Sequence, residues 1–171
     1  MSNGLAFDAD CSTLYFADSA RRTVWRYDYD LETGTVSNKV AHVVLARKDG
    51  LPDGLAVDGA GHLWIAVWFG GFVLQVDAQG IELQRLPLPA NVTQPTAVAI
   101  TPEGDVYVTS SADRGYGSPA AHPLAPEGFD FGVAPLGALF VAKGAAATGA
   151  AEARVADLQD AVFEEKEEEE D

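Results

Sequence analysis

The sequence predicts an all-β fold of the propeller type. Apolar residues alternate with polar ones in short runs, and this period of two residues is typical of strands rather than helices. Turns rich in Asp, Gly and Pro separate the runs. One pattern of two runs joined by a turn occurs three times, and its equivalent residues Leu5, Leu55 and Val98 lie 50 and 43 residues apart. That spacing is typical of propeller blades.

The three repeated segments each predict a β-hairpin. Their first strands are expected at Asn3–Asp8, Asp53–Asp58 and Thr96–Thr101, and their second strands at Thr13–Asp18, His62–Val67 and Asp105–Thr109. Third strands are expected at Val24–Asp28 and Gly71–Asp77, and fourth strands at Val40–Leu45 and Leu83–Leu88. Asp30–Gly34 fits the tip of an extended hairpin. Four strands per repeat are what a propeller blade contains.

The C-terminal part differs in composition. Gly137–Val141 predicts one more strand, and Arg114–Pro135, rich in Gly, Pro and Ala, indicates a loop. We therefore divide the chain into a partial propeller at 1–143 and an Ala/Gly-rich linker with an acidic tail at 144–171. The tail is expected to be disordered or partly helical. Val155, Leu158 and Val162 have helical spacing within 152–163, and Glu164–Asp171 carry seven acidic residues, too polar to bury.

Composition excludes several classes of function. The net charge of −15, from 26 acidic and 11 basic residues, argues against binding nucleic acid. No apolar run approaches the ~18 residues of a membrane helix, and no secretory signal is visible, so we expect no membrane partner and a cytoplasmic location. The single Cys11 excludes an internal disulfide and a cysteine-based zinc cluster, and the three histidines are too far apart for a local metal motif.

The number of repeats is too small for a closed ring. About two complete blades and parts of others are present, whereas propellers contain about 4–8 blades. We interpret the chain as the C-terminal part, about half, of a longer propeller. An open arc leaves strand edges unpaired, which favours self-association through these edges.

One repeat position carries chemistry. Asn3, Asp53 and Thr96 are equivalent and stand at the entry to the first strand of each repeat, the strand that lines a propeller's channel. Oxygen-bearing side chains that converge from several blades suit a hard cation such as Ca²⁺. The structural alternative stays open, because Asn-Gly and Pro-Asp-Gly are also common turn sequences.

The motifs resemble the SMP-30/gluconolactonase/regucalcin family from residue 3 to about 143. The resemblance rests on the runs Asn3–Phe7, Leu14–Ser19, Tyr27–Asp30, Pro52–Asp58, Gly61–Ala66, Val92–Thr96, Val106–Ser110 and Gly137–Phe140. It implies a six-bladed propeller with one divalent metal on its axis, Ca²⁺ before Zn²⁺, Mg²⁺ or Mn²⁺, and hydrolysis of a small-molecule lactone.

The resemblance also implies particular site residues. The family's metal ligands are an N-terminal Glu, an Asn and an Asp, and the last two correspond to Asn3 and Asp53. Asp53 is in addition the candidate general base, while the metal polarises the lactone carbonyl. The Glu and the substrate-contacting Arg and Asn have no counterpart here, and Gln94–Thr96 departs from the family's usual Thr-Ser-Cys segment.

Two classes of function therefore remain. The first is a metal-dependent hydrolase of sugar lactones, impaired by the missing N-terminal half. The alternative is a noncatalytic propeller fragment that acts as a binding or interaction module, so whether the chain is an enzyme stays open.

The remaining aromatic and hydroxyl side chains support structural roles. Trp25 and Trp64 are expected in the core between blades, and Trp68 is a candidate for the channel rim. No Gly-x-Ser-x-Gly elbow supports a serine nucleophile at Ser19 or Ser110.

Overall fold

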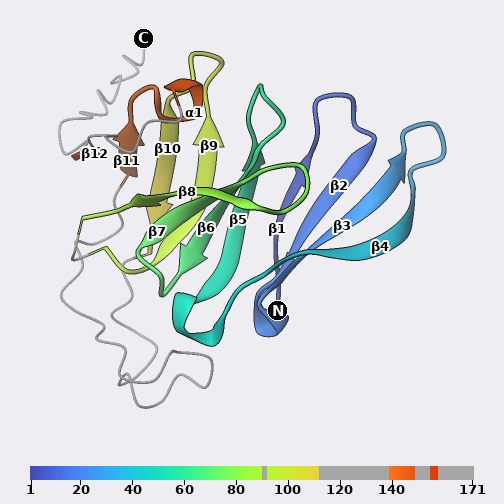
Figure 1. The fold of residues 1–171 in the computed structure, drawn as a ribbon, viewed down its shortest axis with the longest axis horizontal. Helices are drawn as coiled ribbons and strands as arrows, with labels where there is room; N and C mark the ends of the chain where they lie inside the picture. Colours follow the sequence, from blue (N-terminus) through green and yellow to red (C-terminus); the bar gives the residue numbers. More distant parts are fainter. Residues whose placement is uncertain (90–91, 112–138, 149–154, 158–171) are drawn as a thin grey trace, which may run out of the picture.

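The computed structural model describes residues 1–89, 92–111, 139–148 and 155–157, and the architecture of this part is all-β (Figure 1). Its strands form three antiparallel four-stranded sheets in which sequence neighbours pair. The first sheet contains β1 (Ser2–Phe7), β2 (Thr13–Asp18), β3 (Thr23–Asp30) and β4 (Thr35–Val44). The second contains β5 (Leu51–Val57), β6 (Leu63–Trp68), β7 (Phe72–Val76) and β8 (Glu82–Pro87). The third contains β9 (Pro95–Ile100), β10 (Val106–Ser110), β11 (Leu139–Ala142) and β12 (Val155–Asp157).

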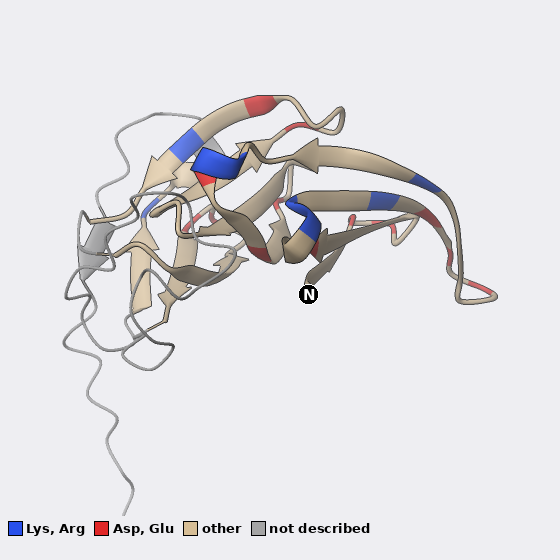
Figure 2. Ribbon diagram, turned by 90° about the horizontal axis from the view of Figure 1, so that it is seen from below, with Lys and Arg blue, Asp and Glu red and all other residues tan. Residues whose placement is uncertain are grey.

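The all-β prediction is confirmed, and the predicted hairpins β1–β2, β5–β6 and β9–β10 are present. β4 begins at Thr35, five residues before the predicted start at Val40, because β3 and β4 continue together to the hairpin tip. Figure 2 shows this hairpin projecting beyond the other strands. At its tip the Asp30 carboxylate accepts hydrogen bonds from the backbone N–H groups of Glu32 and Thr33, which fixes the turn.

The helix predicted within 152–163 is wrong for Val155–Asp157, which form β12 and pair with β11. The edge of β11 offers unpaired backbone groups, and pairing with them outweighs the helical spacing of apolar residues in the sequence. The Ala-rich linker instead contains the short helix α1 (Ala145–Thr148). The rest of the tail and the loop predicted at Arg114–Pro135 lie outside the described residues.

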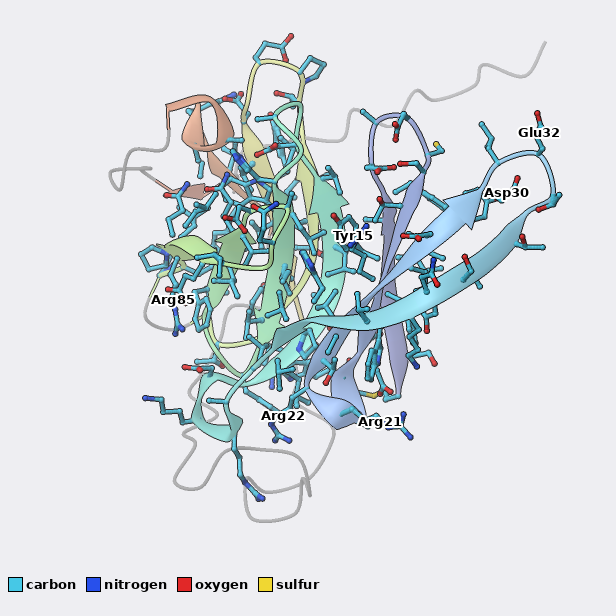
Figure 3. All side chains as sticks on the ribbon, turned by 45° about the vertical axis from the view of Figure 1, so that its right-hand side comes forward. Tyr15, Arg21, Arg22, Asp30, Glu32 and Arg85 are labelled. Carbon is cyan, nitrogen blue, oxygen red and sulfur yellow. The ribbon has the colours of Figure 1, made fainter. Side chains whose placement is uncertain are left out.

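The hydrophobic core lies between the sheets, with the second sheet in the middle. Tyr15 and Val24 of the first sheet pack against Ile65 of the second, and Figure 3 shows Tyr15 directed into the space between these sheets. On the other face of the second sheet, Trp64 packs with Val106 and other apolar residues of the third. Both faces of the second sheet are therefore covered, which explains why every residue of β7 is buried.

The prediction that Trp64 and Trp25 lie in a core between repeats is half right. Trp64 is fully buried between the second and third sheets. Trp25 is only half-buried and lies on the face of the first sheet that points away from the second. Alternation along a strand assigns residues to faces, but it does not say which face of a terminal sheet is covered.

Two surface properties of the described residues bear on partners. No helix among them is long and apolar enough to cross a membrane. Their Lys and Arg residues lie apart, on or next to the 3₁₀ turns η1 (Ser19–Arg21) and η2 (Arg47–Asp49) and on strands such as β4 and β8 (Figure 2).

A buried carboxylate anchors the β5–β6 turn. Asp58 accepts hydrogen bonds from the backbone N–H groups of Ala60 and His62, from Trp64 Nε1 at 2.8 Å and from Gln75 Nε2 at 3.2 Å. Burial alone would raise the pKa of Asp58, but the hydrogen bonds from Trp64 and His62 outweigh it and hold the pKa below its usual value. The ionised form is thus bound more tightly in the folded state than in the unfolded chain.

Replacing Trp64 with phenylalanine is expected to lower the free energy of unfolding by about 2 kcal/mol, because it removes a hydrogen bond to a charged group and some packing. The matched control is Trp25→Phe, since the Trp25 indole N–H has no hydrogen-bond partner among the described residues and its loss costs less. Urea unfolding at several pH values checks both. The part of the stability loss in Trp64→Phe that comes from the missing hydrogen bond should have its largest value above pH 3.8. It should decrease as the pH falls through the lowered pKa of Asp58, because the carboxylate becomes protonated. Equal losses in the two variants at neutral pH would contradict this assignment.

Candidate metal centre

The first strand of each sheet has an irregular register at the repeat position that the sequence singles out. The Cα partners on either side of it are Ser2–Asp18 and Leu5–Phe16 in the first sheet, Pro52–Val67 and Leu55–Ile65 in the second, and Pro95–Ser110 and Ala97–Thr109 in the third. Each first strand thus has one residue more than its partner, as in a β-bulge, and a bulge redirects side chains. Asn3, Asp53 and Thr96 are therefore equivalent in structure as well as in sequence.

The three bulges lie next to one another, because β1 neighbours β5 and β5 neighbours β9 (Figure 1). A methyl group added to Gly4 would lie 2.4 Å from the backbone oxygen of Asp53. One added to Gly54 would lie 2.6 Å from the backbone oxygen of Thr96 and 2.6 Å from the Cα of Ala97. Glycine is required at both positions so that the backbones of adjacent sheets can approach this closely.

Two consecutive hydrogen bonds link the Asn3 side chain to the backbone of the second sheet. Asn3 Nδ2 donates to Ser19 Oγ at 2.8 Å, and the Ser19 hydroxyl donates to the backbone oxygen of Pro52 at 2.6 Å. Ser19 is buried at the end of β2, and Pro52 directly precedes Asp53. Because the amide nitrogen is engaged, Asn3 Oδ1 is the atom left to accept a hydrogen bond or bind a cation.

Asp53 is a buried carboxylate that has no side-chain partner among the described residues. Its exposed fraction is 8%, and within the described part of the chain no hydrogen bond or ion pair reaches its side chain. Burial raises the pKa of Asp53 from 3.8 to about 6. A buried, unpaired carboxylate is costly, and such groups usually bind a metal or serve in catalysis.

The third residue at this repeat position, Thr96, does not offer a free oxygen as Asn3 does. Its hydroxyl forms a hydrogen bond of 2.8 Å with the Thr109 hydroxyl on the adjacent strand β10. The third equivalent position therefore carries a hydroxyl that is already paired within its own sheet.

The side chains of Asn3 and Asp53 at the bulges offer oxygen atoms, the type of ligand that a hard divalent cation prefers. An amide oxygen and a carboxylate are the ligands that Ca²⁺ and Mg²⁺ prefer, and a cation would relieve the cost of burying Asp53. The described residues contain no group of three or more His, Cys, Asp or Glu side chains placed to hold a metal. Asn3 and Asp53 would therefore supply part of a coordination sphere that, for Ca²⁺, takes about 6–8 oxygens.

Sequence reasoning missed the role of Ser19, which it weighed only as a nucleophile. The signal was its position directly after β2, but the decisive contact with Pro52 spans 33 residues and two sheets. The equivalent residue of the second sheet is Trp68, which lies opposite Leu51. Trp68 is half-buried, and its ring packs edge-on against the ring of Phe69. Because Trp68 is paired with Leu51 at the start of β5, it lies at the same end of the sheet as Asp53.

Replacing Ser19 with alanine is expected to cost about 1 kcal/mol of stability, because it removes two hydrogen bonds that are largely buried. It should also weaken divalent-cation binding about three- to tenfold, because the Asn3 amide loses its anchor. Urea unfolding and calcium titration check both effects. Ser37→Ala, at an exposed position of β4, is the matched control and should change neither. Unaltered calcium affinity in Ser19→Ala would show that Ser19 does not orient Asn3.

The model of the "SMP-30/Gluconolactonase/LRE-like region" matches residues 1–112. The chain belongs to this family. Asn3 and Asp53 both lie inside the matched region.

Individual members of the family are similar over the same part. The chain is 42% identical over 116 residues to pentonolactonase XacC of Haloferax volcanii and 37% identical over 114 residues to regucalcin of Xenopus laevis. These matches cover 68% and 66% of the chain. Among solved structures, a regucalcin of Agrobacterium tumefaciens described as a calcium-binding protein superimposes with a TM-score of 0.59 and 26% identity. That match covers 75% of the chain.

The chain is shorter than these relatives. The matched parts make up 40% and 38% of the two curated relatives and 43% of the solved structure. The chain thus spans about two fifths of the length of the family members it matches.

Proposed function

We propose that the chain forms three blades of a six-bladed propeller that hydrolyses sugar lactones, with a divalent cation held in part by Asn3 and Asp53. The observation that carries the proposal is the buried carboxylate of Asp53, which has no partner in the described part of the chain and stands at the bulge next to the bulge of Asn3. Ca²⁺ is the preferred ion because both donors are oxygens. Sugar lactones are the preferred substrates because the family includes a pentonolactonase at 42% identity.

The two residues have different tasks in this proposal. When bound, the cation supplies a Lewis acid for the lactone carbonyl oxygen. Asp53 would accept a proton from the water that attacks the carbonyl carbon, and would return it to the ring oxygen as the bond between that oxygen and the carbonyl carbon breaks. Asn3 offers a neutral oxygen, and Ser19 keeps its amide turned so that this oxygen stays available.

A second candidate function is a noncatalytic module that binds a cation without turnover. It is favoured by the donor set, because the described residues contain no group of three or more His, Cys, Asp or Glu side chains that could complete a catalytic metal site around Asn3 and Asp53.

A hydrolysis assay separates the two candidates. Gluconolactone and a pentonolactone are offered to the full chain with calcium or with EDTA, and acid release is followed with a pH indicator. The proposal expects turnover with calcium, its loss in EDTA and its loss in Asp53→Asn. Asp105→Asn is the matched control, because Asp105 pairs with Lys143 away from the bulges. Turnover that survives both EDTA and Asp53→Asn would overturn the catalytic proposal. Asp53-dependent calcium binding without turnover supports the second candidate.

A further inference from the structure

The first sheet has one apolar face that no other sheet covers among the described residues, although Lys39 Nζ lies 4.1 Å from the centroid of the Trp25 ring on it. We call the side of a sheet that faces the preceding sheet its front face. On the first sheet the front face contains Leu5, Phe7, Leu14, Phe16, Trp25 and Tyr27, which are direct cross-strand partners along β1, β2 and β3. Leu5 is 61% exposed and Phe7 is 42% exposed. This is an unusually apolar surface for an isolated sheet.

The same positions are buried wherever a preceding sheet exists. The strand register gives the counterparts of Leu5, Leu14, Phe16, Trp25 and Tyr27 in the second sheet. In the same order, they are Leu55, Leu63, Ile65, Leu74 and Val76. All five counterparts are buried against the first sheet. In the third sheet the counterparts Val98, Val106 and Val108 are buried against the second. The open front face therefore has the composition of an interface between sheets.

Among the described residues, no other sheet covers the opposite face of the third sheet. We call the side that faces the following sheet the back face. The back faces of the first two sheets share a pattern of two small residues and one aromatic ring. The residues are Ala6, Tyr15 and Ala17 on the first sheet and their counterparts Ala56, Trp64 and Ala66 on the second. Ala99, Tyr107 and Thr109 repeat this pattern on the third sheet. Ala99 and Thr109 are exposed and Tyr107 is half-buried.

We propose that the open front face of one chain binds the open back face of a second copy, so that two chains close a ring of six sheets. The interface between copies then continues the two interfaces that already join the sheets inside each chain. Figure 1 shows the first and third sheets on opposite sides of the second sheet. The inference rests on the propeller part of the proposed function, because three sheets are half of a six-bladed ring.

Symmetry favours a second copy as the occupant. Each chain offers one front face and one back face, so two copies related by a two-fold axis satisfy all four faces with two identical interfaces. A chain of three sheets that bound itself in any non-closing way would leave one face open at each end.

The oligomeric state of the full chain tests the proposal. Light scattering after gel filtration should give twice the 18.0 kDa chain mass at micromolar concentration. Phe7→Arg places a charge on the front face and Ala99→Glu places one on the back face of the third sheet, and each variant alone should be monomeric. Both replaced side chains are exposed, so folding checked by circular dichroism should be unaltered. Ile81→Arg is the matched control at an exposed apolar residue between β7 and β8, and it should stay dimeric.

Mixing the two variants tests how the faces pair. An equimolar mixture of Phe7→Arg and Ala99→Glu retains one unaltered front face and one unaltered back face, so it should recover dimer. A pairing of two front faces would not respond to Ala99→Glu. A monomeric full chain, or a dimer that survives either substitution, overturns the inference. A monomer that still binds calcium through Asp53 would overturn the ring and leave the proposed metal site standing.

Discussion

Gly54→Ala is expected to destabilise the chain by about 3 kcal/mol or more. The added methyl group would lie 2.6 Å from two backbone atoms of β9, where neither neighbour is a flexible side chain that can turn away. Either β5 and β9 move apart, or the bulge that carries Asp53 is distorted. Both outcomes also weaken any site that depends on the bulges of adjacent sheets meeting.

The matched control for this experiment is Gly59→Ala. A methyl group on Gly59, in the β5–β6 turn, meets nothing within 4 Å, so its effect on stability should stay within about 0.5 kcal/mol. Urea unfolding of both variants gives the comparison directly. If Gly54→Ala unfolds at the same denaturant concentration as Gly59→Ala, the close approach of the second and third sheets is wrong.

Asp53→Asn is expected to stabilise the metal-free chain at neutral pH by about 2 to 3 kcal/mol. Burial raises the pKa of Asp53 from 3.8 to about 6, so the folded state holds the proton more tightly than the unfolded chain does. The stability that the protonated carboxyl contributes is present below pH 3.8 and is lost as the pH rises to about 6. Asparagine cannot ionise, so the variant keeps its stability across this range.

The stability difference between Asp53→Asn and the unaltered chain is expected to change with pH in a defined direction. In EDTA, the difference between Asp53→Asn and the unaltered chain should be near zero at pH 3.5, grow up to pH 6 and then stay level. Asp105→Asn should show the opposite sign, because the ion pair with Lys143 lowers the pKa of Asp105. A destabilised Asp53→Asn at pH 7 without metal would mean that the carboxylate has a favourable partner in the folded chain.

Much of the fold can be predicted from the sequence because local chemistry determines it. Alternation and turn residues place the hairpins that contain Leu5, Leu55 and Val98. Aligning these repeats is enough to make Asn3 and Asp53 equivalent. The family resemblance then supplies their expected role as metal ligands.

The features that sequence could not predict depend on contacts between sheets. Ser19 accepts a hydrogen bond from Asn3 and donates one to the Pro52 carbonyl of another sheet, and no local pattern in the sequence predicts the second contact. Trp25 and Trp64 are both on strands, yet only Trp64 has a sheet packed over it. Val155–Asp157 pair with β11 because its edge is available, which helical spacing in the tail cannot reveal.

Calcium titration by calorimetry tests the central claim most directly. The full chain, Asp53→Ala and the control Asp105→Ala are titrated under the same conditions. Weak binding by the seven acidic residues of Glu164–Asp171 is common to all three and cancels in the comparison. The account predicts that Asp53→Ala loses a binding component that the full chain and Asp105→Ala retain. Identical isotherms for the full chain and Asp53→Ala would contradict it, because the buried carboxylate would then hold no cation.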